Sequence, residues 1–203
     1  KRTVIPFNEI PQKVKEATVV AEDAEFYSHS GINIRGILRA IWADIKGGTL
    51  AEGGSSITQQ LIKNAYLSPE RTLGRKIKEL ILSMALERRY SKDEILNFYL
   101  NQIPYGSNSY GIEAAAQTYF NKPAKELTLT EVVYLVAMPK APSYYSPYGN
   151  HGEELKSRAN HILSRMHELK YVSDKDYNNA LKTTVNFVDQ KTNITAPHFV
   201  MFI

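Results

Sequence analysis

Apolar side chains recur at helical spacing along most of this 203-residue chain, and that periodicity limits the fold more than any other feature of the sequence. The stripe through residues 34–45, for example, follows the i, i+3, i+4, i+7 pattern of one helix face. Ser56, Ser91 and Thr128 each precede a Gln or Glu by three residues, which is the spacing of a capping box at a helix start. Only residues 183–188 alternate like a strand. The pattern therefore predicts an all-α fold.

Composition and charge limit the class of protein without choosing its function. With 43% hydrophobic and 23% charged residues, the chain can fold as one domain, or as one domain with two lobes. The formal net charge of +4 suits an anionic partner such as nucleic acid, lipid headgroups or a pyrophosphate. The lack of cysteine excludes disulfides and thiolate catalysis, and no apolar run reaches the ~20 residues that cross a bilayer. Both ends look cut from a longer chain.

An acidic pair, Glu22 and Asp23, closes an apolar segment of a helix predicted over residues 11–27. A carboxylate beside such a segment is partly desolvated, which favours a role as general base. The alternative is an acidic helix end on the surface, with His29 as an ordinary turn residue, because short motifs also match by chance.

A polar helix start is predicted after a glycine-rich stretch. Gly53 and Gly54 open it, and its first turn is dense in hydroxyl and amide side chains: Ser55, Ser56, Thr58, Gln59 and Gln60. Free backbone N–H groups at such a start bind anions. An ordinary capped helix after a flexible loop is the alternative, and the glycine spacing differs from that of a nucleotide-binding P-loop.

The third segment is a predicted helix with a charged side and an apolar side. The charged side carries Arg71, Arg75, Lys76 and Glu79. The apolar side, which we expect to pack against the protein, carries Leu73, Ile77, Leu80, Ile81 and Met84. The alternative is a solvated charged face that the Arg75–Glu79 pair stabilises at i, i+4.

Taken in order, these segments resemble the successive motifs of the family 51 glycosyltransferases. That family comprises the polymerase modules of class A penicillin-binding proteins and their monofunctional relatives. Residues 22–31 are similar to the first motif, with its Glu-Asp pair, Phe, His and Gly. Residues 53–60 are similar to the second, except that Ser56 stands where threonine is usual, and residues 75–79 are similar to the third.

Two further motifs extend the resemblance. Residues 92–101, followed by Tyr105-Gly106, are similar to the fourth motif, with Asn97 in place of the usual acidic residue. Arg158, with Leu163 and Met166 after it, is similar to the fifth. Residues 195–200 resemble the stretch that joins this module to a transpeptidase domain.

The resemblance implies a peptidoglycan glycosyltransferase that polymerises lipid II into β-1,4-linked glycan strands for the bacterial cell wall. The 4-hydroxyl of the acceptor sugar attacks the anomeric carbon of a lipid-linked growing chain, polyprenyl pyrophosphate leaves, and the configuration inverts. Glu22 is then the general base, and Glu79 is a second catalytic carboxylate that we expect to orient the cations. The alternatives for Glu79 are that it helps to hold a divalent metal or contacts the donor sugar. The residues expected to bind substrate are Asp23, Ser55, Gln59, Gln60, Lys63, Asn64, Arg71, Arg75 and Lys76.

The same resemblance implies a lysozyme-like helical fold with a large core lobe and a small membrane-facing jaw lobe. Residues 1–182 would form the glycosyltransferase domain, with the small lobe and a mobile loop at about 32–54, and residues 183–203 would begin a linker toward a transpeptidase domain. The site would face the outer surface of the bacterial cytoplasmic membrane, with an N-terminal transmembrane helix outside this sequence as anchor. We expect the stripe at 34–45 to dip into the headgroups. The implied inhibitor is moenomycin.

Two other functions fit the sequence less well. A lysozyme-like hydrolase also relies on one glutamate, but its carboxylic acid donates a proton and has no use for several cations. A nucleic-acid-binding module should show a coherent basic helix, whereas here Glu70, Glu79 and Glu87 interrupt the basic residues. We therefore expect no nucleic acid partner. No cofactor is required, and a divalent cation (Mg2+ or Mn2+) is compatible with the chemistry but not demanded, since no cluster of oxygen ligands at metal spacing is apparent.

Overall fold

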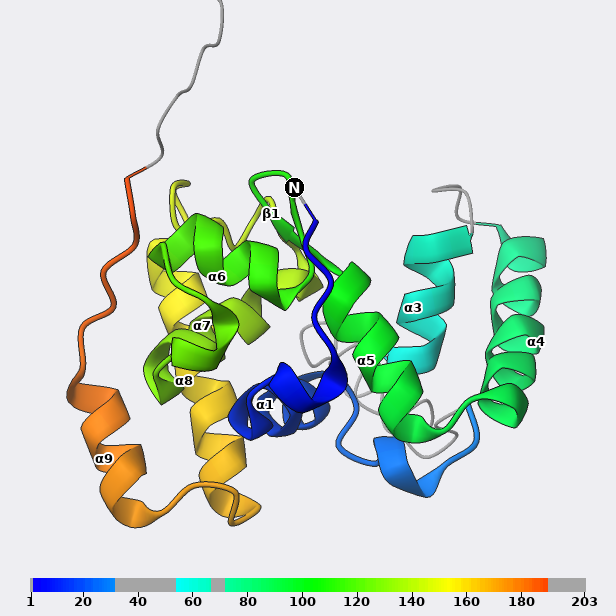
Figure 1. The fold of residues 1–203 in the computed structure, drawn as a ribbon, viewed down its shortest axis with the longest axis horizontal. Coiled ribbons are helices and arrows are strands. Elements are labelled where there is room, and N and C mark those ends of the chain that lie inside the picture. The colour runs from blue at the N-terminus through cyan, green and yellow to red at the C-terminus, as the bar shows by residue number, and fades with distance from the viewer. Residues whose placement is uncertain (1, 32–53, 67–71, 190–203) are drawn as a thin grey trace, which may run out of the picture.

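The computed structural model describes residues 2–31, 54–66 and 72–189, which form a helical protein (Figure 1). The all-α prediction is confirmed. The α-helices are α1 (Gln12–Glu22), α3 (Ile57–Tyr66), α4 (Leu73–Arg89), α5 (Lys92–Gln102), α6 (Ile112–Phe120), α7 (Leu129–Ala137), α8 (Gly152–Glu168) and α9 (Asp174–Lys182). Short 3-10 helices lie at η1 (Phe7–Glu9), η2 (Phe26–Ser28), η3 (Ala124–Glu126) and η4 (Met138–Lys140).

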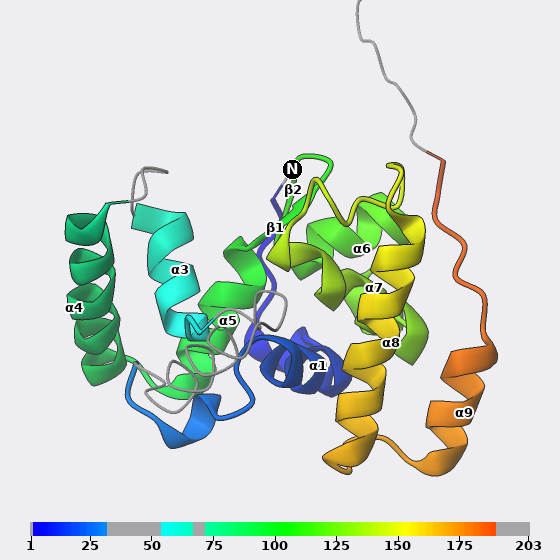
Figure 2. The ribbon, with the colours of Figure 1, turned by 180° about the vertical axis from the view of Figure 1, so that it is seen from behind.

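The helices form two groups (Figures 1 and 2). The smaller group consists of α3, α4 and α5, and the larger group of α1, α6, α7, α8 and α9. Helices α1 and α5 lie where the two groups meet. In the smaller group α3 packs against both α4 and α5. In the larger group α7 contacts α1, α8 and α9. The segment at 34–45, which was expected to belong to a small lobe, lies outside the described residues. Among the helices that the structure describes, none is both long and apolar enough to cross a bilayer.

Side-chain caps fix three of the helix starts, as the sequence predicts. At α5 the hydroxyl of Ser91 accepts the backbone N–H of Glu94, and the Glu94 carboxylate accepts the N–H of Ser91. Thr128 and Glu131 form the same reciprocal pair at α7. At α3 the Ser56 N–H donates to Gln59 Oε1 at 3.3 Å, and the Gln59 N–H donates to Ser56 Oγ at 3.2 Å. Each box satisfies backbone donors that a helix start leaves free.

Helix α1 ends at Glu22 and not near residue 27 as predicted. The backbone leaves helical geometry at Asp23, with φ −162° and ψ 78°, and one further turn forms at η2. Within η2 the Tyr27 hydroxyl donates to Asp93 of α5 at 2.9 Å. The early end of α1 turns the chain from the larger group of helices toward the smaller one.

A small hairpin follows α5, and the sequence pattern did not reveal it. Strands β1 (Pro104–Gly106) and β2 (Ser109–Tyr110) pair antiparallel and are too short to show a two-residue period. Gly111 ends the hairpin with φ +82°, and a Cβ there would lie 2.7 Å from the carbonyl oxygen of Asn101. Only glycine fits this close approach between the hairpin and α5.

Residues 183–188, predicted as a strand, form no strand in the structure. They run extended along the larger group of helices, where the Val188 N–H donates to the Tyr119 carbonyl at 2.9 Å. The Tyr148 hydroxyl donates to the Val188 carbonyl at 2.6 Å. Phe187 stacks on Phe120 with a centroid distance of 5.3 Å. The alternation of the segment reflects this one-sided packing of an extended chain.

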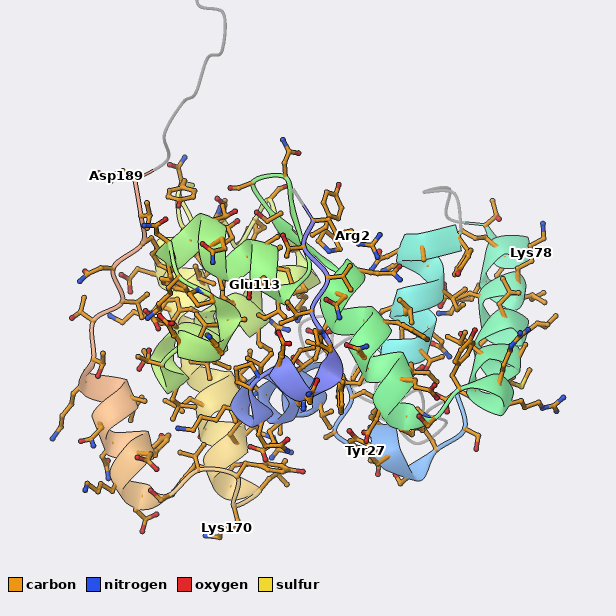
Figure 3. All side chains as sticks on the ribbon, viewed as in Figure 1. Arg2, Tyr27, Lys78, Glu113, Lys170 and Asp189 are labelled. Carbon is orange, nitrogen blue, oxygen red and sulfur yellow. The ribbon has the colours of Figure 1, made fainter. Side chains whose placement is uncertain are left out.

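Helix α4 is oriented opposite to the prediction. Its apolar side was expected to pack, yet Leu73, Ile77 and Ile81 are 86%, 57% and 56% exposed. The polar side is buried instead: Glu79 and Ser83 are 1% and 0% exposed, on a helix that packs against α3 and α5. Lys78 lies on the outer side of α4 in Figure 3. The polar side can be buried because Glu79 is paired with cations and the Ser83 hydroxyl donates to the Glu79 carbonyl.

Candidate active site

Glu22 lies at the end of α1, between the two groups of helices, and its carboxylate is held from both sides. Arg158 Nη2, from α8 in the larger group, donates to Oε1 at 3.3 Å. Gln60 Nε2, from α3 in the smaller group, donates to Oε2 at 2.9 Å. The Glu22 side chain is 9% exposed. A nearly buried carboxylate with both oxygens engaged is fixed in place, as a general base requires.

Two buried tyrosines lie near enough to this carboxylate to be affected by its charge. Tyr99 of α5 and Tyr105 of β1 are each 1% exposed. Burial, and after it the negative charge of Glu22, raises the pKa of both phenols well above the ordinary value. Tyr99 therefore stays protonated and donates to Gln60 Oε1 at 3.2 Å. That bond identifies the amide oxygen of Gln60 and turns the amide N–H toward Glu22.

A second carboxylate, Glu79, pairs with two cations of α4. Arg75 Nη1 lies 3.3 Å from Glu79 Oε2, and Lys76 Nζ pairs with Glu79 Oε1. Lys76 also donates to Ser55 Oγ at 3.0 Å, so the start of α3 joins the group. The side chains of Arg75 and Lys76 are 16% and 41% exposed, whereas that of Glu79 is 2% exposed. Lys76 thus remains open to solvent beside a buried anion, and Arg75 is only partly so.

Asp23 is adjacent to Glu22 in the sequence but contacts other residues. It is 5% exposed, pairs with His29 Nε2 at 2.8 Å, and accepts the backbone N–H of Ile57 at 3.3 Å. It therefore joins the first motif to the start of α3. Gln59 is fully buried in its capping box. These contacts give both residues a supporting position, and the substrate contacts expected of them stay predictions.

The predicted residues Lys63 and Asn64 are exposed at the far end of α3. They lie three and four positions after Gln60, about one helical turn along the same side of the helix. Asn64 also lines a pocket with Arg2, Gln102 and Tyr110. Arg71, predicted to bind substrate, lies outside the described residues, so the part it plays stays a prediction.

Three residues near the site had no role assigned from the sequence. Tyr99, Tyr105 and Arg158 lie in the segments that resemble the fourth and fifth motifs, and this resemblance was the signal that could have found them. The unusual Asn97 accepts a bond from Asn101 Nδ2 at 2.8 Å, within a cluster that also holds the backbone of Ile5. Ser56, where threonine is usual, still donates its hydroxyl, here to the Gly31 carbonyl at 2.7 Å.

A metal site was left open by the sequence. Across residues 2–31, 54–66 and 72–189, no three His, Asp or Glu side chains come together in a group that could hold a metal ion. Both oxygens of Glu79 are directed to Arg75 and Lys76. The use of Mg2+ or Mn2+ therefore stays an open prediction.

The chain is similar to known proteins over most of its length. A family model described as "Transglycosylase" matches residues 1–167. The chain is 45% identical over 202 residues to penicillin-binding protein 1F of Bacillus subtilis, covering 100% of this chain and 28% of that one. It is 45% identical over 181 residues to penicillin-binding protein 1A of Aquifex aeolicus, covering 89% and 25%.

A solved structure gives the same result for the fold. The crystal structure of penicillin-binding protein 1A from Haemophilus influenzae matches with a TM-score of 0.58 at 27% identity, covering 93% of this chain and 18% of that one. The chain spans about a quarter of the length of the curated relatives described above.

Proposed function

Because the chain belongs to the transglycosylase family, we propose that it is a peptidoglycan glycosyltransferase that polymerises lipid II into β-1,4-linked glycan strands. The observation that carries the proposal is the Glu22 carboxylate, which is nearly buried and bonded to Arg158 and Gln60. Two partly exposed cations on α4, Arg75 and Lys76, complement it close to the start of the helix that supplies Gln60.

In the proposed reaction Glu22 removes the proton from the 4-hydroxyl of the acceptor sugar. The oxygen attacks the anomeric carbon of the lipid-linked donor chain, and the bond from that carbon to the pyrophosphate breaks with inversion. The pyrophosphate leaves as an anion and needs charge neutralisation rather than a proton. Arg75 and Lys76 supply positive charge, and Lys63 and Arg71 are proposed to add to it.

The contact with Arg158 favours this reaction over hydrolysis by a lysozyme-like acid. A hydrolase keeps its glutamic acid protonated in an apolar pocket so that it can donate a proton. A guanidinium in contact with Glu22 favours the ionised carboxylate instead. An ionised carboxylate accepts protons, which is the direction that transfer to a sugar hydroxyl requires.

The test is polymerisation of labelled lipid II by the full-length protein, with separation of products by size. Glu22→Gln keeps the shape of the side chain and removes the base, so the rate should fall by about two to four orders of magnitude. Glu16→Gln serves as a matched control, because Glu16 lies on the same helix and bonds to Gln12 at the surface. A folded Glu22→Gln protein that polymerises at a near-normal rate would falsify the assignment.

We also propose that the site works at the outer surface of the cytoplasmic membrane, since the substrate is lipid-linked. The support is the apolar row on α4, made of Leu73, Ile77 and Ile81, which is exposed and followed by Met84 at 37% exposure. Burying each side chain in the headgroup boundary contributes about 1.5–3 kcal/mol. The stripe at 34–45, for which the sequence predicts the same contact, lies outside the described residues, and that prediction stays open.

Liposome co-sedimentation tests the membrane contact. The double change Ile77→Glu, Ile81→Glu should weaken binding clearly, because it puts two charges on the proposed contact surface. A matched control is Leu169→Glu, Leu181→Glu, which alters two exposed leucines of the larger group of helices. Equal binding by wild type and both doubles would assign the membrane contact to another part of the protein.

A further inference from the structure

Arg158 makes two contacts besides the one with Glu22, which lies 136 residues before it in the chain. Its Nε donates at 3.0 Å to the carbonyl oxygen of Ala137, the last residue of α7. Its guanidinium lies 5.7 Å from the centroid of the Tyr145 ring, and its side chain is 10% exposed. Its Nη2 donates to Glu22 Oε1 in addition to these contacts. The guanidinium is therefore held in place by the larger group of helices, independently of Glu22.

We infer that Arg158 is a positioning residue that holds the Glu22 carboxylate in its ionised state and in one orientation, so that it can act as the base. This inference rests on the proposed function of Glu22 and adds to it the group that keeps the base ready. Gln60 holds the other oxygen from α3. The carboxylate is thus clamped between one element of each helix group.

The surroundings of Glu22 explain why a cation is needed. Burial disfavours a charged carboxylate, and at 9% exposure little water reaches this one. Within the part of the chain that the structure describes, the groups near it include the neutral amide of Gln60 and the phenols of Tyr99 and Tyr105, both of which burial keeps protonated. Asp23, next in the chain, is paired with His29. Arg158 supplies the positive charge that offsets the loss of hydration.

Lysine should not replace this arginine fully. The guanidinium has several donors in a fixed fork, so Nε can hold the Ala137 carbonyl while Nη2 holds Glu22. A lysine has a single nitrogen on a flexible stem and no planar face for Tyr145. Charge would be retained, whereas the orientation of Glu22 would be looser.

The experiment is the pH dependence of lipid II polymerisation by the full-length protein, from about pH 5 to about pH 9. In Arg158→Met the acidic limb should move to higher pH by about one to three units, since a contacting cation shifts a carboxylate by that amount. Activity should partly recover at the alkaline end. Arg158→Lys should move the limb less. Arg165→Met is the matched control on α8, because Arg165 pairs with Glu168 at the surface, and its profile should match wild type.

A structural role for Arg158 predicts something different, namely the same fold-loss at every pH, and that result would overturn the inference. Should Arg158→Met fail to fold, Arg158→Gln keeps a donor for the Ala137 carbonyl without the charge and carries the same expectation. Infrared titration gives a measurement on the folded wild type, in which the carboxylate band absent from Glu22→Gln should stay ionised down to about pH 5. A band that is protonated there would also overturn the inference. The proposed function fails separately, through an active Glu22→Gln.

Discussion

The hydroxyl of Tyr99 offers a sensitive test of how the site is held. Tyr99→Phe removes one oxygen from a fully buried side chain and with it the donor to Gln60 Oε1. Leaving a buried acceptor without its donor costs about 1–3 kcal/mol. Because Gln60 is only partly buried and water can reach its amide, we expect about 1 kcal/mol, or a fall in Tm of about 2–4 °C for a chain of this size.

The effect on activity should exceed the effect on folding. Without the phenol the Gln60 amide loses the donor to its oxygen and is held only through its N–H groups, by Glu22 and the Ser55 carbonyl, so its orientation toward Glu22 is less firmly fixed. We expect the rate of lipid II polymerisation to fall about tenfold, equivalent to about 1.4 kcal/mol in the barrier. Tyr148→Phe is the control: it also removes a hydroxyl, one that donates to the Val188 carbonyl, and should cost stability without slowing the reaction. Equal slowing by both variants, or none in Tyr99→Phe, would refute this reasoning.

Two further changes probe the cations and the hairpin. Lys76→Met should weaken moenomycin binding by about tenfold or more, because one charge-assisted contact is worth about 1.5–3 kcal/mol. In the same fluorescence titration, Lys78→Met on the outer side of α4 should leave the affinity unchanged. Equal affinities of the two variants would argue against a pyrophosphate site at Lys76. Gly111→Ala should lower the free energy of unfolding in urea by at least about 1–2 kcal/mol, through positive φ and the clash with the Asn101 carbonyl, and a stability equal to wild type would show that the hairpin shifts freely.

Features that depend on neighbours in sequence were predictable. The boxes at Ser91 and Thr128 join groups three residues apart, so the sequence specifies both partners at once. The Arg75–Glu79 contact is predictable for the same reason, because positions i and i+4 share a helix face. The resemblance to the family motifs likewise predicts that Glu22 and the polar start of α3 belong to one site.

Features that depend on the fold were not predictable. The period of α4 shows that the helix has two unlike sides, but it does not say which side meets α3. The prediction that the apolar side packs is wrong, because Glu79 is paired with Arg75 and Lys76 and can therefore be buried at the interface. The pairing of Glu22 with Arg158 spans most of the chain, and nothing local to either residue indicates it.

The extended segment after α9 has a mechanical consequence. Phe187 sits among aromatic rings of α6 and α7, and Val188 is bonded at both its N–H and its carbonyl to the same group of helices. A pull on the chain beyond Asp189 would load these bonds before it reached α9. Arg158 lies on α8 of that same group, while Gln60 lies on α3 of the other. Tension along the polypeptide would therefore act on the group that carries Arg158, one of the two that hold the Glu22 carboxylate between them.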